Sequence, residues 1–363
     1  MKSRSSRYHR QTLLRGIGEA GQERLGNTTV LVLGCGALGC VVADMLARAG
    51  IGHLILVDRD VVESTNLQRQ VLFDENDVVQ GLPKSEAAKR RLEKINSDIR
   101  ISSFADDLNH TNIERYAADA DVLVDGLDNF ETRYLANDVA VKRGLPYVYG
   151  AAVGTSGMVF PILPRGDGTN EWQSGKSDLS TPCFRCLFPD APPPGASDTC
   201  ETVGVLNSLV GVIANLQVTE TLKIASGNFE SVNRKLITID PWTNDWTQLG
   251  VDRTRAASDC RCCRQRRFDF LDGMEGSSTT ALCGRNAVQL RQRQQNLRVD
   301  FATLEQRLTP YGAVSSNEFL LKAEIVDGEL PVEITLFKDG RAIIKGTDDP
   351  STARSVYTKF IGA

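Results

Sequence analysis

The sequence predicts an α/β fold built around a doubly wound, mainly parallel sheet. From about residue 28 onward, short apolar runs alternate with segments of helical spacing. Strands separated by helices of about 10 to 15 residues pair in parallel through right-handed crossovers. The first apolar run ends at Gly34 and leads through a glycine-rich turn into a helix. The composition is ordinary for a globular chain of 363 residues, with 41% hydrophobic and 24% charged side chains, which excludes bulk disorder, collagen and coiled coil.

The expected elements of the parallel half lie within the first 164 residues. Strands are expected at residues 30–33, 54–57, 99–104, 122–124 and 147–149. Helices are expected at residues 41–49, 85–95 and 132–142. The longest uncharged run, 145–163, contains two prolines and three glycines, so it suits strands and turns and not a membrane-spanning helix.

After residue 164 the composition changes. Residues 165–181 are polar and glycine-rich, and residues 189–199 are proline-rich. Long loops of this kind often carry function. A helix is expected at residues 206–225, followed by antiparallel strands at 236–239 and 246–249 that continue the sheet.

A small α+β domain is expected at residues 281–363, behind a first domain at 1–264 and a linker at 265–280. Asp300 is a good N-cap for a helix at 301–308. The remaining elements are expected as strands at residues 319–325, 332–337 and 342–345, a turn at 338–340 and a last helix from 350 to 360.

The charge balance and the cysteine count narrow the class of protein. With 42 basic and 46 acidic side chains the net charge is -4, which gives no electrostatic footprint for nucleic-acid binding. Nine cysteines are an odd number, so a fully paired disulfide framework is excluded, and a reducing, cytoplasmic location away from membranes is expected. Three histidines leave little room for a His-rich metal centre.

The glycine-rich turn is the first functional motif. Gly34, Gly36, Ala37 and Gly39 lie between a strand and a helix. The free N–H groups and the dipole at such a helix N-terminus favour a phosphate. Asp58 ends the next strand, where an acid accepts hydrogen bonds from a ribose. This Rossmann-like pattern predicts a nucleotide site without distinguishing NAD from ATP.

The charged residues that follow separate these two nucleotides. Asp60, the run Asn66–Gln70 and Lys84 come after the ribose acid, and Lys84 opens a helix. An enzyme that cleaves ATP needs cations where charge builds up in the transition state, whereas hydride transfer leaves the pyrophosphate intact. The set therefore favours ATP cleavage over NAD-linked oxidoreduction.

A longer pattern runs through the chain in this order: Arg7–Gln11, the glycine turn, Asn66–Gln70, Pro83–Lys84, and Asp125–Asn129 with Arg133. This pattern resembles the ThiF/MoeB/HesA family, bacterial relatives of the ubiquitin-activating enzymes, over about residues 7–263. The tail segments 281–289 and 339–347 are similar to the extension of the longer, Bacillus-type ThiF adenylyltransferases.

The resemblance implies an ATP-dependent adenylyltransferase that acts on the C-terminal glycine carboxylate of a small ubiquitin-like sulfur carrier ending in Gly-Gly, with release of pyrophosphate. Residues 1–164 would bind ATP, and residues 165–264 would hold the carrier and a zinc knuckle. The long tail favours the ThiF branch, whose carrier is ThiS-like and serves thiamine thiazole synthesis. The MoeB branch, which serves molybdenum cofactor synthesis, stays open as the alternative.

The resemblance also assigns roles residue by residue. Asp128 would bind Mg²⁺, and Arg10 would reach across the interface of a homodimer as an arginine finger. Mg²⁺ and fixed cations are what an anionic transition state at the α-phosphorus requires. Arg69, Lys84 and Cys200 complete the implied catalytic set. The implied nucleotide contacts are Gly34, Gly36, Ala37, Gly39, Asp58, Asp60, Asn66, Arg69, Gln70, Lys84, Asp128 and Asn129.

Two C-x-x-C pairs predict a structural zinc site. Cys183 with Cys186, and Cys260 with Cys263, offer four thiolates for a closed tetrahedral centre. Chelation by the C-x-C pair of Cys260 and Cys262 stays open, although the family pattern favours Cys263.

Cys200 is the candidate for thiol chemistry. It follows the proline-rich loop and precedes a helix, whose dipole would favour a thiolate, while the neighbouring Glu201 opposes it. By resemblance, this thiol would link to the activated carrier during sulfur transfer, with a cysteine desulfurase as the sulfur donor. Cys35, Cys40 and Cys283 are expected to be core residues.

Two further interpretations come from other classes of protein. A relative without activity that only docks a ubiquitin-like partner is disfavoured, because all the implied ATP contacts are present. Adenylation of a modified tRNA would favour a basic face, and the net charge of -4 disfavours it weakly.

Overall fold

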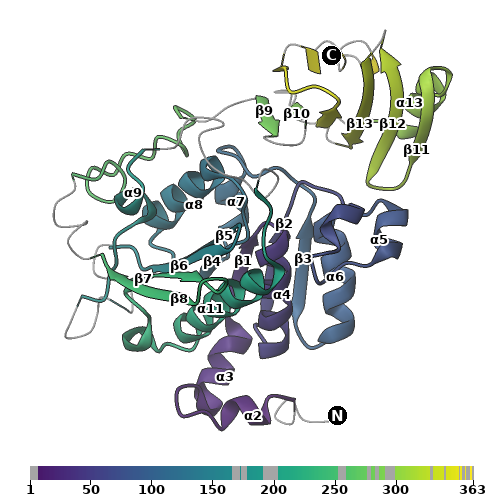
Figure 1. Ribbon diagram of the computed structural model, residues 1–363. Helices are drawn as coiled ribbons and strands as arrows, with labels where there is room; N and C mark the ends of the chain where they lie inside the picture. Colours follow the sequence, from purple (N-terminus) through teal and green to yellow (C-terminus); the bar gives the residue numbers. More distant parts are fainter. Residues whose placement is uncertain are drawn as a thin grey trace. The chain divides into compact units, whose positions relative to one another are not determined.

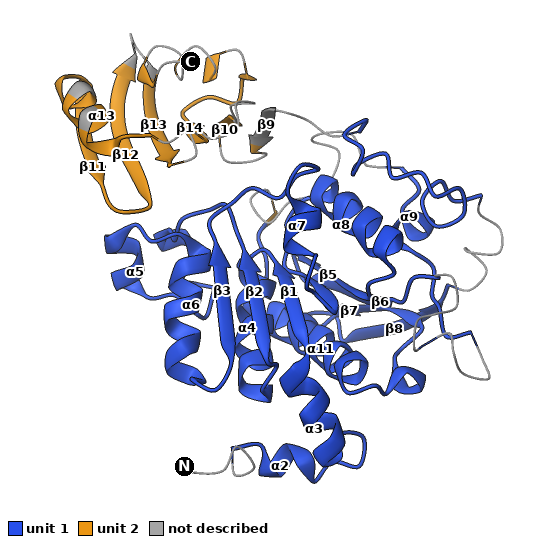
Figure 2. Cartoon of the chain, turned by 180° about the vertical axis from the view of Figure 1, so that it is seen from behind, with its two compact units in different colours: residues 1–192, 204–275 blue, residues 193–203, 276–363 orange. Residues whose placement is uncertain are grey.

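The described part of the chain forms two compact units. The computed structural model describes residues 7–165, 172, 178–190, 203–251, 259–275, 279–282, 286–290, 299–327, 330–338, 341–350, 352–353, 356 and 360–361. The larger unit comprises residues 1–192 and 204–275, and the smaller one comprises residues 193–203 and 276–363 (Figure 2). No helix among the described residues is long and apolar enough to cross a membrane.

An eight-stranded sheet forms the centre of the larger unit (Figure 1). In spatial order its strands are β3 (Arg100–Phe104), β2 (His53–Val57), β1 (Thr29–Leu33), β4 (Val122–Asp125), β5 (Tyr147–Val153), β6 (Ser156–Ile162), β7 (Lys235–Asp240) and β8 (Asp245–Gly250). The pairs from β3 to β5 are parallel, and those from β5 to β8 are antiparallel. This confirms the predicted doubly wound sheet with an antiparallel continuation.

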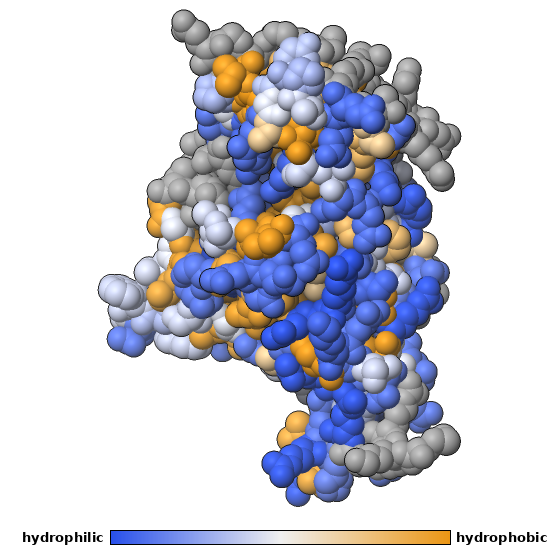
Figure 3. Space-filling model, turned by 90° about the vertical axis from the view of Figure 1, so that its right-hand side faces the viewer, coloured by the Kyte–Doolittle hydropathy of each residue, from blue (hydrophilic) through white to orange (hydrophobic). Residues whose placement is uncertain are grey.

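Helices cover both faces of this sheet, because parallel neighbours need crossover connections, which are usually helices that pack on a face of the sheet. On one face α4 (Ala37–Ala49) packs against α6 (Lys84–Ile95) and α11 (Asn207–Ala225). On the other face, alternate residues of β1 and β2 form a core with α7 (Ile113–Tyr116) and α8 (Phe130–Arg143). The side of the molecule that carries α6 is largely hydrophilic, as expected for a helix that buries only one stripe (Figure 3).

Several short elements of the larger unit differ from the expectation. Strand β6 was not among the expected elements, because Gly157 and Pro161 interrupt its pattern. Pro161 is tolerated there because β7 pairs only with residues 157–159, so no ladder bond from a Pro161 N–H to β7 is needed. Other elements that were not expected are α7, α2 (His9–Thr12), α3 (Gly18–Asn27) and α5 (Glu75–Gln80), which are short or weakly patterned.

The smaller unit is an antiparallel sheet with a helix packed on it, as predicted for an α+β domain. In spatial order its strands are β11 (Gly312–Ser316), β12 (Leu320–Asp327), β13 (Leu330–Phe337), β14 (Ala342–Lys345), β10 (Ala287–Leu290) and β9 (Thr279–Leu282). Helix α13 (Phe301–Leu308) shares a core with alternate residues of β12, β13 and β14. Phe270 and Leu271, in the segment expected as a linker, are buried in the core of the larger unit. The last expected helix lies only partly within the described residues.

Candidate functional site

Close contact between main chains shapes the glycine turn between β1 and α4. Gly34 has a φ of +91°, and a Cβ on Gly39 would lie 2.0 Å from the Gly34 carbonyl oxygen. A Cβ on Gly126, just past β4, would lie 2.5 Å from the same oxygen. At Gly36, by contrast, the nearest atom would be 3.6 Å away. The end of β1, the start of α4 and the end of β4 therefore touch, while Gly36 leaves open backbone at the helix N-terminus, where a phosphate is favoured.

Asp58 ties the end of β2 to this turn. Its Oδ2 accepts a hydrogen bond from the Cys35 N–H at 2.6 Å, and its Oδ1 accepts one from the Asp60 N–H at 2.7 Å. Burial raises the pKa of the Asp58 carboxyl, and the nearby Lys84 ammonium opposes that rise. Cys35 and Cys40 are buried, as predicted for core residues. The ribose acid predicted from the sequence thus lies directly against the glycine turn.

A cluster of charged side chains lies at the carboxyl ends of β2, β3 and β4. Lys84 is 3% exposed, and its Nζ lies 3.0 Å from Asp60 Oδ2. Arg59 lies 3.1 Å from Asp107 Oδ1 through Nη1, and 3.8 Å from Asp60 Oδ1 through Nε. Burial lowers the pKa of Arg59, but Asp107, Asp60 and Asp128 raise it more, so the net shift is upward. Arg59 was not predicted from the sequence, although its position directly after Asp58 was a usable signal.

The run Asn66–Gln70 begins at the last residue of the short helix η1 (Ser64–Asn66). Asn66 is 2% exposed, and its Oδ1 accepts a hydrogen bond from the Glu63 N–H at 3.0 Å. Arg69 is half-buried and donates to the Thr65 carbonyl at 2.9 Å. Gln70 Oε1 and Ser85 Oγ are buried without a hydrogen-bond partner among the described residues. Such atoms carry a desolvation penalty that a ligand or a rearrangement can relieve.

The segment after β4 presents Asp128 to the solvent. Asp125 is fully buried, and its carboxylate accepts hydrogen bonds from Tyr147 Oη at 2.7 Å, Arg133 Nε at 3.1 Å and the Leu127 N–H at 2.9 Å. Burial raises the pKa of Asp125, and Arg133 counteracts that rise. Asp128 is exposed, and its Oδ1 lies 3.2 Å from Asn129 Nδ2.

Asn129 fixes the start of the next helix. Its Oδ1 accepts a hydrogen bond from the Thr132 N–H at 2.9 Å, which caps α8. The exposed carboxylate of Asp128 therefore stands on a segment whose main chain is held at both ends.

Arg10 lies apart from the glycine turn of its own chain. It is exposed in α2, which is held against the C-terminal end of α4: Gln11 Nε2 donates to the Ala49 carbonyl at 2.9 Å, and Tyr8 is buried beside Gly50. The glycine turn is at the opposite end of this 13-residue helix, about 20 Å away at 1.5 Å per residue. Cys200 lies outside the described residues.

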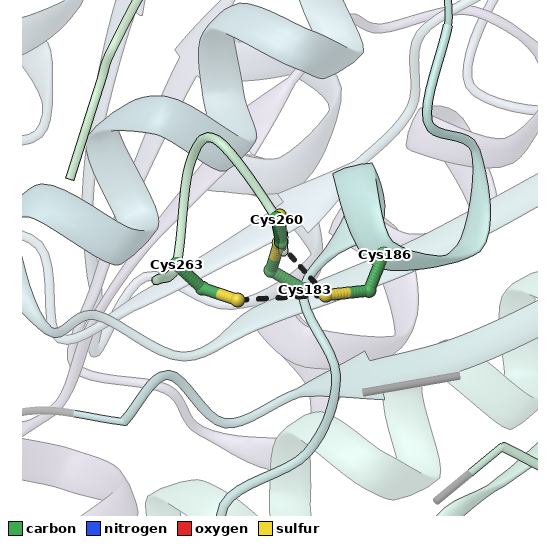
Figure 4. Close-up of side chains that lie close together, drawn as sticks. All are labelled: Cys183, Cys186, Cys260 and Cys263. Atoms are coloured by element: carbon green, nitrogen blue, oxygen red, sulfur yellow. Dashed lines mark hydrogen bonds between the residues drawn. The ribbon is translucent and has the colours of Figure 1, made fainter. Parts of the chain in front are cut away.

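Four cysteine side chains converge at one point, as Figure 4 shows. Cys183 immediately precedes the short helix α9 (Phe184–Leu187) and Cys186 lies within it, and the other pair lies on a loop more than 70 residues later. The sulfur of Cys183 is 3.6 Å from that of Cys260, and the sulfur of Cys186 is 3.4 Å from that of Cys263. A tetrahedral zinc site with Zn–S bonds of about 2.3 Å places its sulfurs about 3.8 Å apart. The cluster therefore fits a metal ion such as zinc.

Cys262 is not part of this cluster. It is fully buried, and its Sγ accepts a hydrogen bond from Asn137 Nδ2 at 3.3 Å. The Oδ1 of Asn137 in turn accepts the Phe184 N–H at 2.8 Å, so one amide on α8 joins both cysteine segments. Of the two arrangements that the sequence left open, the structure brings together the one with Cys263.

The chain is similar to known proteins in sequence and in fold. The ThiF family model matches residues 8–262. The sulfur carrier protein ThiS adenylyltransferase of Bacillus subtilis (strain 168) is 39% identical over 363 residues, which cover 99% of this chain and 100% of that protein. The sulfur carrier protein adenylyltransferase of Thermus thermophilus is 38% identical over 259 residues, 71% of this chain and 92% of that protein. A crystal structure of E. coli MccB with ATP aligns with a TM-score of 0.52 and 28% identity, over 68% of this chain and 71% of that one. The chain belongs to the ThiF family.

Proposed function

We propose that this chain transfers AMP from ATP to the C-terminal carboxylate of a small sulfur carrier protein of the ThiS type. Membership of the ThiF family and the full-length likeness to a ThiS adenylyltransferase support this activity. The observation that carries it is the convergence of the glycine turn, Asp58, the Lys84–Asp60 pair and Asp128 at the carboxyl ends of neighbouring parallel strands. In open α/β sheets, ligands bind at the carboxyl ends of the parallel strands.

The reaction is a displacement at the α-phosphorus of ATP. A carboxylate oxygen of the carrier attacks the α-phosphorus, the bond to the bridging oxygen of the β-phosphate breaks, and pyrophosphate leaves. We assign the phosphates to the N-terminus of α4 at Gly36, and the ribose to Asp58. Asn66, Arg69 and Lys84 would contact the triphosphate, where fixed cations stabilise the charge that develops.

Asp128 is the residue that we assign to Mg²⁺. Magnesium in nucleotide enzymes is usually held by one or two carboxylates together with substrate phosphates, and an exposed carboxylate beside the glycine turn fits that set. Bound Mg²⁺ supplies positive charge that offsets the negative charge of the phosphates. Asn129 orients the carboxylate, because its amide lies 3.2 Å from Asp128 Oδ1.

The proposal also includes a zinc ion, a homodimer and a reactive thiol. The four-cysteine cluster would hold zinc as a structural ion. A homodimer would bring Arg10 of a second copy to the phosphates, since α2 of the same chain is held at the end of α4 opposite the glycine turn, and α4 is about 20 Å long. The thiol of Cys200 would link to the activated C-terminus of the carrier during sulfur transfer, with a cysteine desulfurase as the sulfur donor. We place this reaction in the cytoplasm.

A direct experiment tests the activity and the choice of carrier. The chain is incubated with Mg-ATP and with either a ThiS-type carrier or the small subunit of molybdopterin synthase, both ending in Gly-Gly, and each carrier is weighed by mass spectrometry. We expect an added adenylyl group on the ThiS-type carrier. Adenylation of the other carrier alone would establish the MoeB-type alternative, and no adduct on either would overturn the proposed function.

A further inference from the structure

Strands β4 and β5 separate close to the candidate site. They pair at only two positions, Leu123 with Tyr147 and Val124 with Val148. Strand β4 then ends at Asp125, whereas β5 runs on to Val153 in a ladder with β6. Past Val148, the edge of β5 that faces β4 lacks a described ladder, and the segment that carries Asp128 starts at this gap.

Gln217 of α11 bridges the two strands from one face of the sheet. The side chain is fully buried, and its Nε2 donates to the Asp125 carbonyl at 2.8 Å and to the Val148 carbonyl at 3.2 Å. Its Oε1 has no partner among the described residues. A buried amide with an unsatisfied oxygen is costly, so the two donated hydrogen bonds are the contribution that distinguishes Gln217 from an apolar residue.

Gly150 makes room for this amide. A Cβ on Gly150 would lie 2.3 Å from Gln217 Cδ, so any larger residue there would displace the side chain. From the opposite face, Arg133 Nη2 donates to the Leu127 carbonyl at 2.6 Å and to the Gly150 carbonyl at 3.4 Å. The start of the Asp128 segment is therefore clamped by α8 from one side and by α11 from the other.

We propose that Gln217 is a positioning residue for Asp128. By holding the Asp125 carbonyl against β5, it fixes the start of segment 126–129, so that the exposed carboxylate is already in place when Mg-ATP arrives. Loss of the two donors would let this segment move and would weaken the binding of Mg²⁺ together with ATP. This inference rests on the proposed function, because it uses the role assigned to Asp128.

The test separates positioning from packing. Gln217→Met keeps the length of the side chain and removes its donors. We expect the Mg²⁺ concentration that half-saturates ATP binding, measured by calorimetry, to rise about tenfold, as the loss of one net hydrogen bond would give. In the double variant Gly150→Ala with Gln217→Ala, the new methyl fills part of the vacated space, so the unfolding temperature should recover relative to Gln217→Ala while the Mg²⁺ requirement should not.

Asn215→Ala is the matched control, because this amide is exposed on the same helix and, among the residues that the structure describes, bonds only to the Gly211 carbonyl at 2.7 Å. It should leave both readouts unchanged. A wild-type Mg²⁺ requirement in Gln217→Met, or its recovery in the double variant, overturns the proposal. Adenylation of the carrier by the wild-type chain is measured in parallel through pyrophosphate exchange. If the wild-type chain binds Mg-ATP but adenylates no carrier, the proposed function fails, while the binding data still decide the role of Gln217.

Discussion

Lys84 and Asp60 are joined twice, once through their side chains and once through their main chains. The Lys84 ammonium lies 3.0 Å from the Asp60 carboxylate, and the Lys84 N–H donates to the Asp60 carbonyl at 2.9 Å. The first turn of α6 is therefore fastened to the segment after β2. Because the Lys84 side chain is only 3% exposed, its charge is largely removed from water and depends on nearby anions.

Replacing Asp60 by Asn should destabilise the protein by about 3 kcal/mol, because the buried ammonium loses its carboxylate partner. The free energy of unfolding in urea measures this loss. Glu114→Gln is the control, since its ion pair with Lys142 is also 3.0 Å long but about 40% exposed on each side. That change should cost less than about 1 kcal/mol, and equal losses in the two variants would contradict the argument.

Two glycines of the nucleotide turn should respond differently to alanine. Gly126→Ala places a methyl 2.5 Å from the Gly34 carbonyl and should lower the free energy of unfolding by about 1 to 3 kcal/mol. Gly36→Ala meets no atom closer than 3.6 Å and should cost less than about 1 kcal/mol, yet it should weaken ATP binding about tenfold or more by occupying the open backbone. Denaturation and nucleotide titration are measured on both variants, and the reverse order of stability losses would refute the packing account.

The four-cysteine cluster should contain one zinc ion per chain by elemental analysis. Cys263→Ser should lose the metal and unfold at lower temperature, because a structural site contributes its binding free energy to folding. Cys262→Ser should keep the metal, since Cys262 accepts a hydrogen bond from Asn137 and its sulfur is not among the four that converge. Loss of zinc in Cys262→Ser with retention in Cys263→Ser would show that the other chelating pair is used.

The proposed action of Arg10 in a second copy predicts complementation between inactive variants. Arg10→Ala and Lys84→Ala should each fail in pyrophosphate exchange. An equal mixture should recover about a quarter of the wild-type rate, because half of the dimers are hybrids and each hybrid has one complete site. Arg15→Ala, an exposed arginine of the same segment, serves as the control and should stay active. No recovery after mixed dimers have been verified would remove the role in the second copy.

Asp128→Ala should reduce pyrophosphate exchange about a hundred- to a thousandfold, because the phosphates lose the ion that this carboxylate is proposed to hold. The exposed side chain contributes little to packing, so the unfolding temperature should stay close to that of the wild type. Exchange kinetics over a range of Mg²⁺ concentrations provide the measurement. Normal exchange in this variant would exclude Asp128 as the magnesium residue.

The parallel half of the fold was predictable because its signals are local. Apolar runs such as residues 30–33 and 54–57 stand between segments of helical spacing, and the structure has strands at both places. Strand β6 was not predictable in the same way. Its Pro161 is compatible with the sheet because β7 pairs no further than residue 159, and that fact belongs to the tertiary structure.

The candidate site also contains residues that local patterns predict and residues that only the tertiary structure reveals. The glycine turn, Asp58 and the two C-x-x-C pairs could be found from spacing, because turns, strand ends and chelating knuckles each restrict the sequence nearby. Arg59 directly follows Asp58, but its pairing with Asp107, on the loop after another strand, is visible only in the tertiary structure. Gln217 escaped for the same reason: within an apolar helix nothing distinguishes it until the carbonyls of β4 and β5 are seen beside its amide.

The pairing of Cys183 with Cys260 also changes what a break in the chain would do. These residues are 77 positions apart, so a metal held by the cluster closes a large ring that includes α11, β7 and β8. In the chain-entropy account of cross-links, a closure of this length lowers the conformational entropy of the unfolded state and so raises its free energy by about 4.5 kcal/mol. A protease that cuts once inside the ring would therefore leave two fragments that stay joined until a chelator strips the ion.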